Sequence, residues 1–187
     1  MIRDLLILVQ DCAAEKGDLG SILWALDQSK KPNIRIIKIL KEAAIHCHMH
    51  ILAWLETVVP IEEFVHRAIK PATIEGHVEV LKWVVRNGYK WDAKKDYQHY
   101  LTAIKNSKLQ VLVWMNSCAP VFTTDTTFLS IYASQLGEFE IVKWLHKNVC
   151  PCNQDSYRAA RENCQWRTEK WIYQQLYVER RRLLWAP

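Results

Sequence analysis

Residues 72–92 read ATIEGHVEVLKWVVRNGYKWD, and this stretch contains the pattern that decides the fold. The small pair Ala72-Thr73 precedes Gly76, and an apolar-rich segment follows around Trp83. Glycine readily adopts the left-handed backbone found where helices end, so Gly76 indicates a tight turn. The stretch therefore predicts the end of one helix, a turn, and a second helix that runs through Trp83.

The same pattern recurs along the chain in register with a column of tryptophans, whose spacings are 30, 29, 31, 30 and 27 residues. The tryptophans are Trp24, Trp54, Trp83, Trp114, Trp144 and Trp171. Eleven positions before each tryptophan every row has alanine: Ala13, Ala43, Ala72, Ala103, Ala133 and Ala160. Seven positions before it the residue is small: Gly17, Cys47, Gly76, Ser107, Gly137 and Cys164. The positions five before and one after each tryptophan are apolar in all six rows. Agreement of independent columns indicates an internal repeat, in which the tryptophans and turn glycines have structural roles.

The second helix of each row is expected to be packed on several sides. In residues 77–88 the polar positions Glu79, Lys82 and Arg86 form one narrow stripe, and the remaining surface is mostly apolar. The prediction is an all-α fold, a solenoid of about six helical hairpins including caps, in one domain over 1–187. The predicted repeats cover roughly 5–30, 33–60, 62–90, 92–121, 123–151 and 153–187.

The links between rows contain helix-start signals. Nine residues after five of the tryptophans come Asn33, Glu63, Asp92, Thr123 and Asn153. Four of these five are residue types whose side-chain oxygen accepts from free N–H groups at a helix start. These four residues are predicted to lie at the start of the first helix of a hairpin. The first helices are expected to differ in length by about one turn.

The last row has features expected of a polar cap. Glu169 replaces the apolar residue of the middle rows, and Arg167 and Lys170 add charge. A polar outer face on a terminal repeat keeps a solenoid soluble. The tail YVERRRLLWAP, 177–187, is expected to continue as a helix, with its three arginines forming a solvated face rather than a nuclear or nucleic-acid signal.

Composition narrows the function classes. Half of the 187 residues are hydrophobic, which argues against disorder, and no apolar run reaches the roughly 18 residues of a membrane span. The start MIRDLLILVQD lacks the apolar length of a secretory signal, so the six cysteines are expected to be reduced. These observations favour a cytoplasmic protein, with the nucleus as the alternative. The net charge of +5 permits acidic partners without requiring nucleic acid.

The stretch AAIHCHMHILAWL, 43–55, suggests a metal site that the columns argue against. Cys47 falls in the turn column, His48 in a column interpreted as solvated, Met49 in an apolar core column, and His50 in the polar stripe. No second ligand pair occurs at zinc-finger spacing, so surface histidines and no metal are predicted.

The segment Cys150-Pro151-Cys152 is too closely spaced for thioredoxin-type chemistry, which uses two intervening residues. Cys152 also shares a column with Trp91 and Phe122. A packed loop is therefore predicted there, because a free cysteine behaves as a small hydrophobe.

Residues 72–92 resemble an ankyrin repeat, through Ala72-Thr73, Gly76-His77, the apolar second helix and Asn87-Gly88. The tryptophan-bearing LKW form is similar to the divergent ankyrin repeats common in large DNA viruses and protists. The period is shorter than the usual 33 and the Thr-Pro-Leu-His signature is absent, so a plain stack of α-hairpins is predicted. Tetratricopeptide repeats, with a period of 34, are the alternative architecture.

The resemblance implies a non-enzymatic module that binds another protein, for a viral chain a host or virion protein. The sequence contains no phosphate-binding loop, G-x-S-x-G or H-E-x-x-H, so no catalysis, cofactor or small-molecule substrate is predicted. The predicted binding residues are Tyr89, Lys90, Trp91 and Phe122, in two inter-row loops, because aromatic side chains often dominate interfaces. For Trp91 and Phe122 the alternative is packing within each repeat, because they share a column with Cys152. The alternative is a basic α-solenoid that binds nucleic acid, which requires a continuous basic face.

Overall fold

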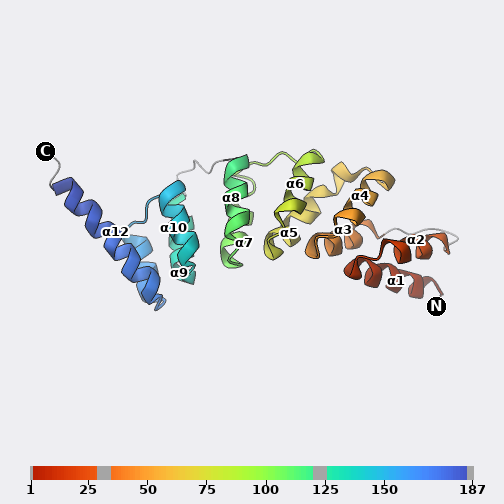
Figure 1. Cartoon of the computed structure of the whole chain (residues 1–187), viewed down its shortest axis with the longest axis horizontal. Coiled ribbons are helices and arrows are strands. Elements are labelled where there is room, and N and C mark those ends of the chain that lie inside the picture. The colour runs from red at the N-terminus through yellow and green to blue at the C-terminus, as the bar shows by residue number, and fades with distance from the viewer. Residues whose placement is uncertain (1, 29–34, 120–125, 185–187) are drawn as a thin grey trace. The chain divides into compact units, whose positions relative to one another are not determined.

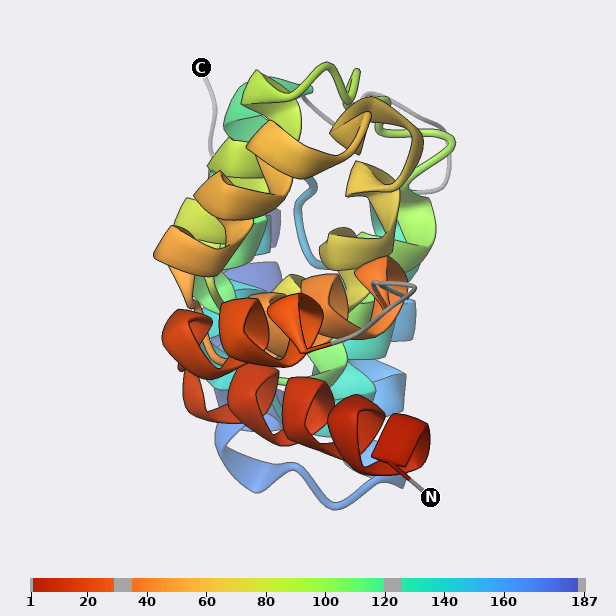
Figure 2. The same cartoon turned by 90° about the vertical axis from the view of Figure 1, so that its right-hand side faces the viewer.

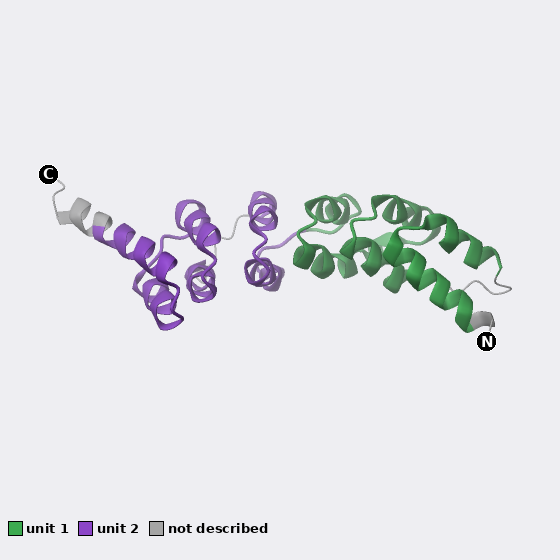
Figure 3. Ribbon diagram, turned by 60° about the horizontal axis from the view of Figure 1, so that its bottom comes forward, with its two compact units in different colours: residues 1–90 green, residues 91–187 purple. Residues whose placement is uncertain are grey.

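The computed structural model describes residues 2–28, 35–119 and 126–184. Every regular element in these ranges is a helix and none is a β-strand, which confirms the all-α prediction. The chain divides into two compact units, residues 1–90 and 91–187 (Figure 3). The division falls between the third and fourth sequence rows, and each unit is described by itself.

Unit 1 is built from three pairs of α-helices, with two short 3₁₀ helices before the fifth α-helix (Figure 1). The elements are α1 Ile2–Lys16, α2 Leu19–Asp27, α3 Ile36–Ile45, α4 Met49–Val58, η1 Ile61–Glu63, η2 Val65–Ala68, α5 Ile69–Glu75 and α6 Val78–Arg86. Within each pair the two helices pack together, as Figure 2 shows for α1 and α2. The first helices also pack in series, α1 on α3 and α3 on η2 and α5.

Unit 2 repeats this organisation with three further pairs. They are α7 Tyr97–Lys105, α8 Leu109–Cys118, α9 Thr126–Leu136, α10 Phe139–Asn148, α11 Gln154–Glu162 and α12 Trp166–Leu184. The first helices again pack in series, α7 on α9 and α9 on α11. Helix α12 extends through the basic segment of the tail, as the sequence predicted for residues up to 184.

The turn inside every pair has the same backbone geometry. The six residues of the small column all have positive φ: Gly17 75°, Cys47 56°, Gly76 91°, Ser107 58°, Gly137 75° and Cys164 56°. In each pair the N–H after this residue donates to the carbonyl of the column alanine, as from His77 to Ala72 at 2.9 Å. This six-to-one bond with a left-handed residue is the Schellman ending of a helix. The predicted turn column is confirmed in all six rows.

Two columns form most of the core. All six column alanines are at most 5% exposed. The residues directly after each tryptophan are at most 1% exposed: Ala25, Leu55, Val84, Met115, Leu145 and Ile172. Alanine suits its column because a bulkier side chain would separate the closely packed helices.

The tryptophans do not form a uniformly buried column. Trp83 is 2% exposed and Trp24 is 53% exposed, and the other four are half-buried. Met49 was predicted in a core column, but it is half-buried, like the other members of that column except the exposed Trp166. The tryptophans differ in exposure because different neighbours cover each large ring. The residue directly after each tryptophan is buried in all six rows.

The column interpreted as solvated connects successive pairs instead. His48 lies with Nε2 3.0 Å from the carbonyl of Glu15, and His77 occupies the same position 2.8 Å from that of Ile45. In unit 2 the Ser107 hydroxyl donates to Glu138 over 2.7 Å. Each of these contacts connects a helix pair to the turn of the pair before it. The prediction of a solvated column is therefore wrong for these residues, which hold neighbouring pairs together.

The predicted helix starts are confirmed only in part. The Asn153 side chain accepts from the Ser156 N–H at 2.9 Å and caps α11. Asp92 was predicted to begin the fourth first helix, but its carboxylate accepts from the N–H groups of Lys94 and Lys95, and α7 begins only at Tyr97. Asp92 therefore caps a preceding turn. Asn33 and Thr123 lie outside the described residues.

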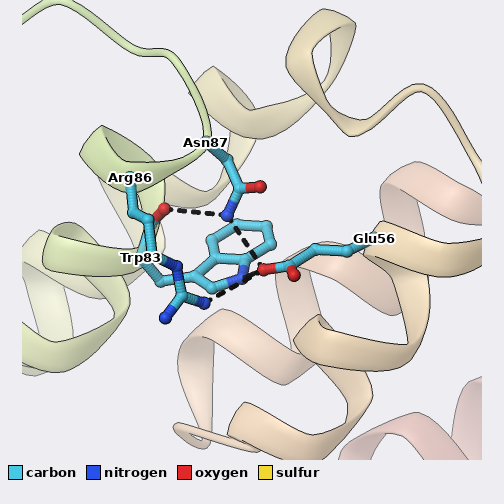
Figure 4. Close-up of polar contacts among 4 residues, drawn as sticks. All are labelled: Glu56, Trp83, Arg86 and Asn87. Atoms are coloured by element: carbon cyan, nitrogen blue, oxygen red, sulfur yellow. Dashed lines mark hydrogen bonds and ion pairs between the residues drawn. The ribbon is translucent and has the colours of Figure 1, made fainter.

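A polar cluster joins α4 to α6 in unit 1 (Figure 4). The carboxylate of Glu56 accepts from the indole Nε1 of Trp83, from Arg86 at 3.1 Å and from the Asn87 amide at 2.9 Å. Burial is the largest single influence on this carboxyl and opposes its ionisation. The three hydrogen bonds and the charge of Arg86 outweigh it, so the pKa of Glu56 lies below its ordinary value.

Candidate protein-interaction surfaces

The loop that ends unit 1 contains two of the four predicted binding residues. Tyr89 is half-buried and its N–H donates to the Val84 carbonyl at 3.3 Å, whereas Lys90 is exposed. The preceding Gly88 has a φ of 92°, which lets the chain leave α6 in a tight turn. Tyr89 and Lys90 are accessible to different degrees, and their binding role stays a prediction.

Trp91 belongs to unit 2 and packs inward. Its indole Nε1 donates to the hydroxyl of Tyr100 at 3.4 Å, and its ring lies edge-on to Trp114 with centroids 5.6 Å apart. The Tyr100 hydroxyl donates in turn to the carbonyl of Ala119, and burial raises the pKa of Tyr100 to about 12. Trp91 thus has a packing role within unit 2, and Phe122 lies outside the described residues.

A groove between the first helices of unit 1 was not identified from the sequence. It has a volume of about 460 Å³ and lies between α3 and the η2–α5 segment. Its apolar lining consists of Ile45, Pro71 and Ile74, all half-buried. Its polar lining is Lys41, His66, Arg67, Lys70 and Glu75, all exposed. The result is an open apolar strip with cationic side chains at its edge.

Three groove cations differ from their neighbours, because within the described parts of the chain they pair with no carboxylate. On the same helix Lys38 pairs with Glu42 at 2.5 Å, and Arg35 pairs with Asp11 at 2.5 Å. Among the described residues Lys41, Arg67 and Lys70 form no ion pair and no side-chain hydrogen bond. The positive charge at the groove is therefore only partly balanced, by Glu75 in its lining.

The register of the rows contains a signal for this groove. Lys41 and Lys70 both lie thirteen residues before their tryptophans, and Ile45 and Ile74 both lie nine before. No other row combines a basic residue with an apolar one at these two positions. Equivalent positions on adjacent first helices face the same side, so this pairing would have located the groove.

A second surface lies on the last helix pair of unit 2. Trp166 is 69% exposed, Tyr173 57% and Tyr177 48%. The Tyr173 ring lies 6.0 Å from Tyr157 of α11 and 6.4 Å from Tyr177. A hollow of about 490 Å³ is lined by Tyr157, Trp166, Glu169, Lys170 and Tyr173. We call the four residues Tyr157, Trp166, Tyr173 and Tyr177 the aromatic surface.

The aromatic surface lies beside the charged residues of the predicted polar cap. Arg167 is exposed, Glu169 is half-buried and Lys170 is exposed, as expected of a solvated end. Trp166, however, lies in the column five before the tryptophan, where the other five members are half-buried. The charges of this row are visible in the sequence, whereas the exposure of Trp166 is not, because its column is apolar in every row.

The histidines of residues 46–50 contact the preceding helix pair or stack on each other. His50 lies with Nε2 2.7 Å from the carbonyl of Gly17, and His48 contacts Glu15 in the same turn. The His46 and His48 rings stack with centroids 5.6 Å apart. In the described part of the chain no group of three or more His, Cys, Asp or Glu side chains is placed to hold a metal ion.

The cysteine pair of residues 150–152 is packed, as predicted. Cys150 is 4% exposed, with its thiol 3.1 Å from the Thr126 carbonyl, and Cys152 is 3% exposed beside the Ser130 hydroxyl. Burial, reinforced by the neighbouring Cys152, raises the pKa of Cys150 to about 11. A thiol in this state is a poor nucleophile at neutral pH.

No family model, no curated protein and no solved structure matches this chain. Within the described residues, no helix has both the length and the apolar character needed to cross a membrane.

Proposed function

We propose that this chain is a non-enzymatic protein-interaction module, built as an ankyrin-like array of α-hairpin repeats. The observation that carries the proposal is the aromatic surface of α11 and α12. Trp and Tyr are enriched at protein interfaces because they bury a large area with few rotatable bonds. A Trp that is 69% exposed beside two half-exposed tyrosines has no role in the core of its own unit.

The repeat interpretation is supported by features shared between rows. The six left-handed turns, the six buried alanines and the serial packing of first helices within each unit are what a hairpin array requires. Such an array presents extended surfaces, which suits binding to another protein. A fold alone is weak warrant for a function, so the proposal depends on the exposed aromatic side chains.

The charges around the aromatic surface favour a protein over nucleic acid. Glu169 and Lys170 both line its hollow, and Arg158 pairs with Asp155 at 3.4 Å on the adjacent helix. A nucleic-acid site would require a continuous basic face for the phosphates. The second-helix stripes are similarly neutralised, with Lys82 paired to Glu79 at 2.7 Å.

The test is affinity capture with the immobilised chain from nuclease-treated extract, followed by calorimetry with each purified candidate partner. The double variant Trp166→Ala/Tyr173→Ala should lose the partner, whereas Trp24→Ala should retain it. Trp24 is a matched control, because it is 53% exposed but lies in unit 1. Absence of any saturable protein partner for the wild type, or equal loss in both variants, would overturn the proposal.

A further inference from the structure

We infer that the groove between α3 and η2–α5 binds an acidic amphipathic segment of a partner protein. The segment would place one or two apolar side chains on Ile45, Pro71 and Ile74, and its carboxylates beside Lys41, Arg67 and Lys70. This inference rests on the proposed function as a protein-interaction module, but it concerns a different surface in a different unit.

The apolar strip requires an apolar contact from the ligand. Ile45, Pro71 and Ile74 are half-buried and line the groove together. Removing such apolar surface from water favours binding in proportion to the area buried. A ligand carrying charge alone would leave this strip wet, so a simple polyanion does not match the site.

The cationic rim requires an acidic ligand. Lys41, Arg67 and Lys70 supply three positive charges and Glu75 one negative charge, so the net charge is two positive before His66 is considered. Because these cations form no pair within the described residues, a ligand carboxylate does not have to displace an internal partner. Complementary rim charges mainly accelerate association and select the partner.

The arrangement fits a protein segment better than nucleic acid. Glu75 lies in the groove itself. A phosphate backbone would meet this carboxylate, whereas a peptide can place a neutral or basic residue beside it. A groove of about 460 Å³ accommodates a few side chains of such a peptide.

The binding test uses the full chain and a fluorescent peptide of about twelve residues, with four glutamates flanking two leucines, measured by anisotropy at several salt concentrations. The controls are a hexaglutamate without leucines and a short DNA duplex. The acidic leucine peptide should bind saturably and more tightly than either control. Stronger binding of the duplex would assign the groove to nucleic acid and overturn the inference.

Variants locate the binding site. Lys70→Glu should weaken the peptide by about tenfold, whereas Lys147→Glu, the same charge reversal at an exposed site on α10, should leave it unchanged. A peptide in which lysines replace two of the glutamates should bind the Lys70→Glu variant more tightly than the wild type. This rescue distinguishes loss of a charge contact from damage to the fold, which a thermal melt of each variant also checks.

The possible failures are distinguishable from those of the proposed function. An acidic peptide that does not bind up to millimolar concentration, or one weakened equally by Lys70→Glu and Lys147→Glu, overturns the groove inference. The capture experiment with Trp166→Ala/Tyr173→Ala is unaffected by that result, because those residues belong to unit 2.

Discussion

The imidazole Nε2 of His77 lies 2.8 Å from the backbone carbonyl oxygen of Ile45, a residue near the turn of the preceding helix pair. His48 forms the equivalent contact one pair earlier, to the carbonyl of Glu15 at 3.0 Å. The carbonyl groups at a helix end have no partner within the helix. The histidine side chain therefore contacts a backbone carbonyl at a helix end of the preceding hairpin, which has no partner within its own helix.

His77→Ala should destabilise the chain by about 1 kcal/mol, the usual contribution of a neutral hydrogen bond. The measurement is chemical denaturation at neutral pH. His46→Ala is the matched control, since His46 is exposed and its ring stacks on His48, and it should change stability by less than about 0.5 kcal/mol. Equal losses would mean that the contact to Ile45 does not stabilise the fold.

The tryptophans should differ in importance according to their burial. Trp83→Ala should cost about 3–5 kcal/mol, because it removes a side chain that is 2% exposed. Trp24→Ala should cost much less, since Trp24 is 53% exposed, and half-buried Trp114 should fall between them. Unfolding free energies of the three variants decide this. A large loss at Trp24 would contradict the described burial.

The Glu56 cluster should make stability depend on pH. Because the folded-state pKa of Glu56 lies below the ordinary value of 4.5, ionised Glu56 stabilises the fold above that pH. This contribution is lost as the pH falls through the lower folded-state pKa. Glu56→Gln should therefore be less stable than the wild type at pH 7, and the difference should shrink below pH 4.5. A difference that is constant from pH 7 to pH 3 would refute the ionic role.

The left-handed turn column offers a stabilising substitution. Cys164 is exposed with a φ of 56°, a conformation that a residue with Cβ adopts at a cost. Cys164→Gly should raise stability by about 0.5–1 kcal/mol, after allowing for the greater freedom of glycine in the unfolded chain. Thermal melting under reducing conditions would measure it.

The opposite substitution at Gly137 is the control for that prediction. Gly137→Ala should be destabilising, because φ is 75° and a Cβ would lie 2.0 Å from the Gln165 side-chain oxygen unless Gln165 moved. A destabilised Cys164→Gly together with a neutral Gly137→Ala would mean that the turn geometry is wrong.

The sequence predicted the helices and turns well because backbone constraints repeat with the period. The turn position holds only small residues, and the position between the paired helices holds alanine in all six rows. Both columns can therefore be recognised from the sequence. Exposure of Trp24 and Trp166 was not predictable in this way, because it depends on which neighbour covers each ring. The position of His48 was wrongly predicted as solvated for the same reason. A polar residue type suggests exposure to solvent even when the side-chain nitrogen contacts a backbone carbonyl.

Tyr89 and Trp91 were chosen as binding residues by residue type and loop position, and that role stays a prediction. The structure packs Trp91 against Tyr100 and Trp114, as the column that it shares with Phe122 and Cys152 indicated. The groove around Lys41 and Lys70 depends on residues from two rows that face each other, and a row-by-row reading does not compare them. Placing basic and apolar positions of adjacent rows side by side would have revealed it.

The neighbour-to-neighbour packing within each unit also bears on how the chain responds to force. The main partners of a helix are the helices next to it or next but one along the chain, so pulling on the ends loads one hairpin after another in series. A hairpin row of 27 to 31 residues that gives way releases about 100 Å of extended chain. Extension at constant speed should therefore show repeated small steps of that length, without one large rupture, and the protein would behave as a soft spring.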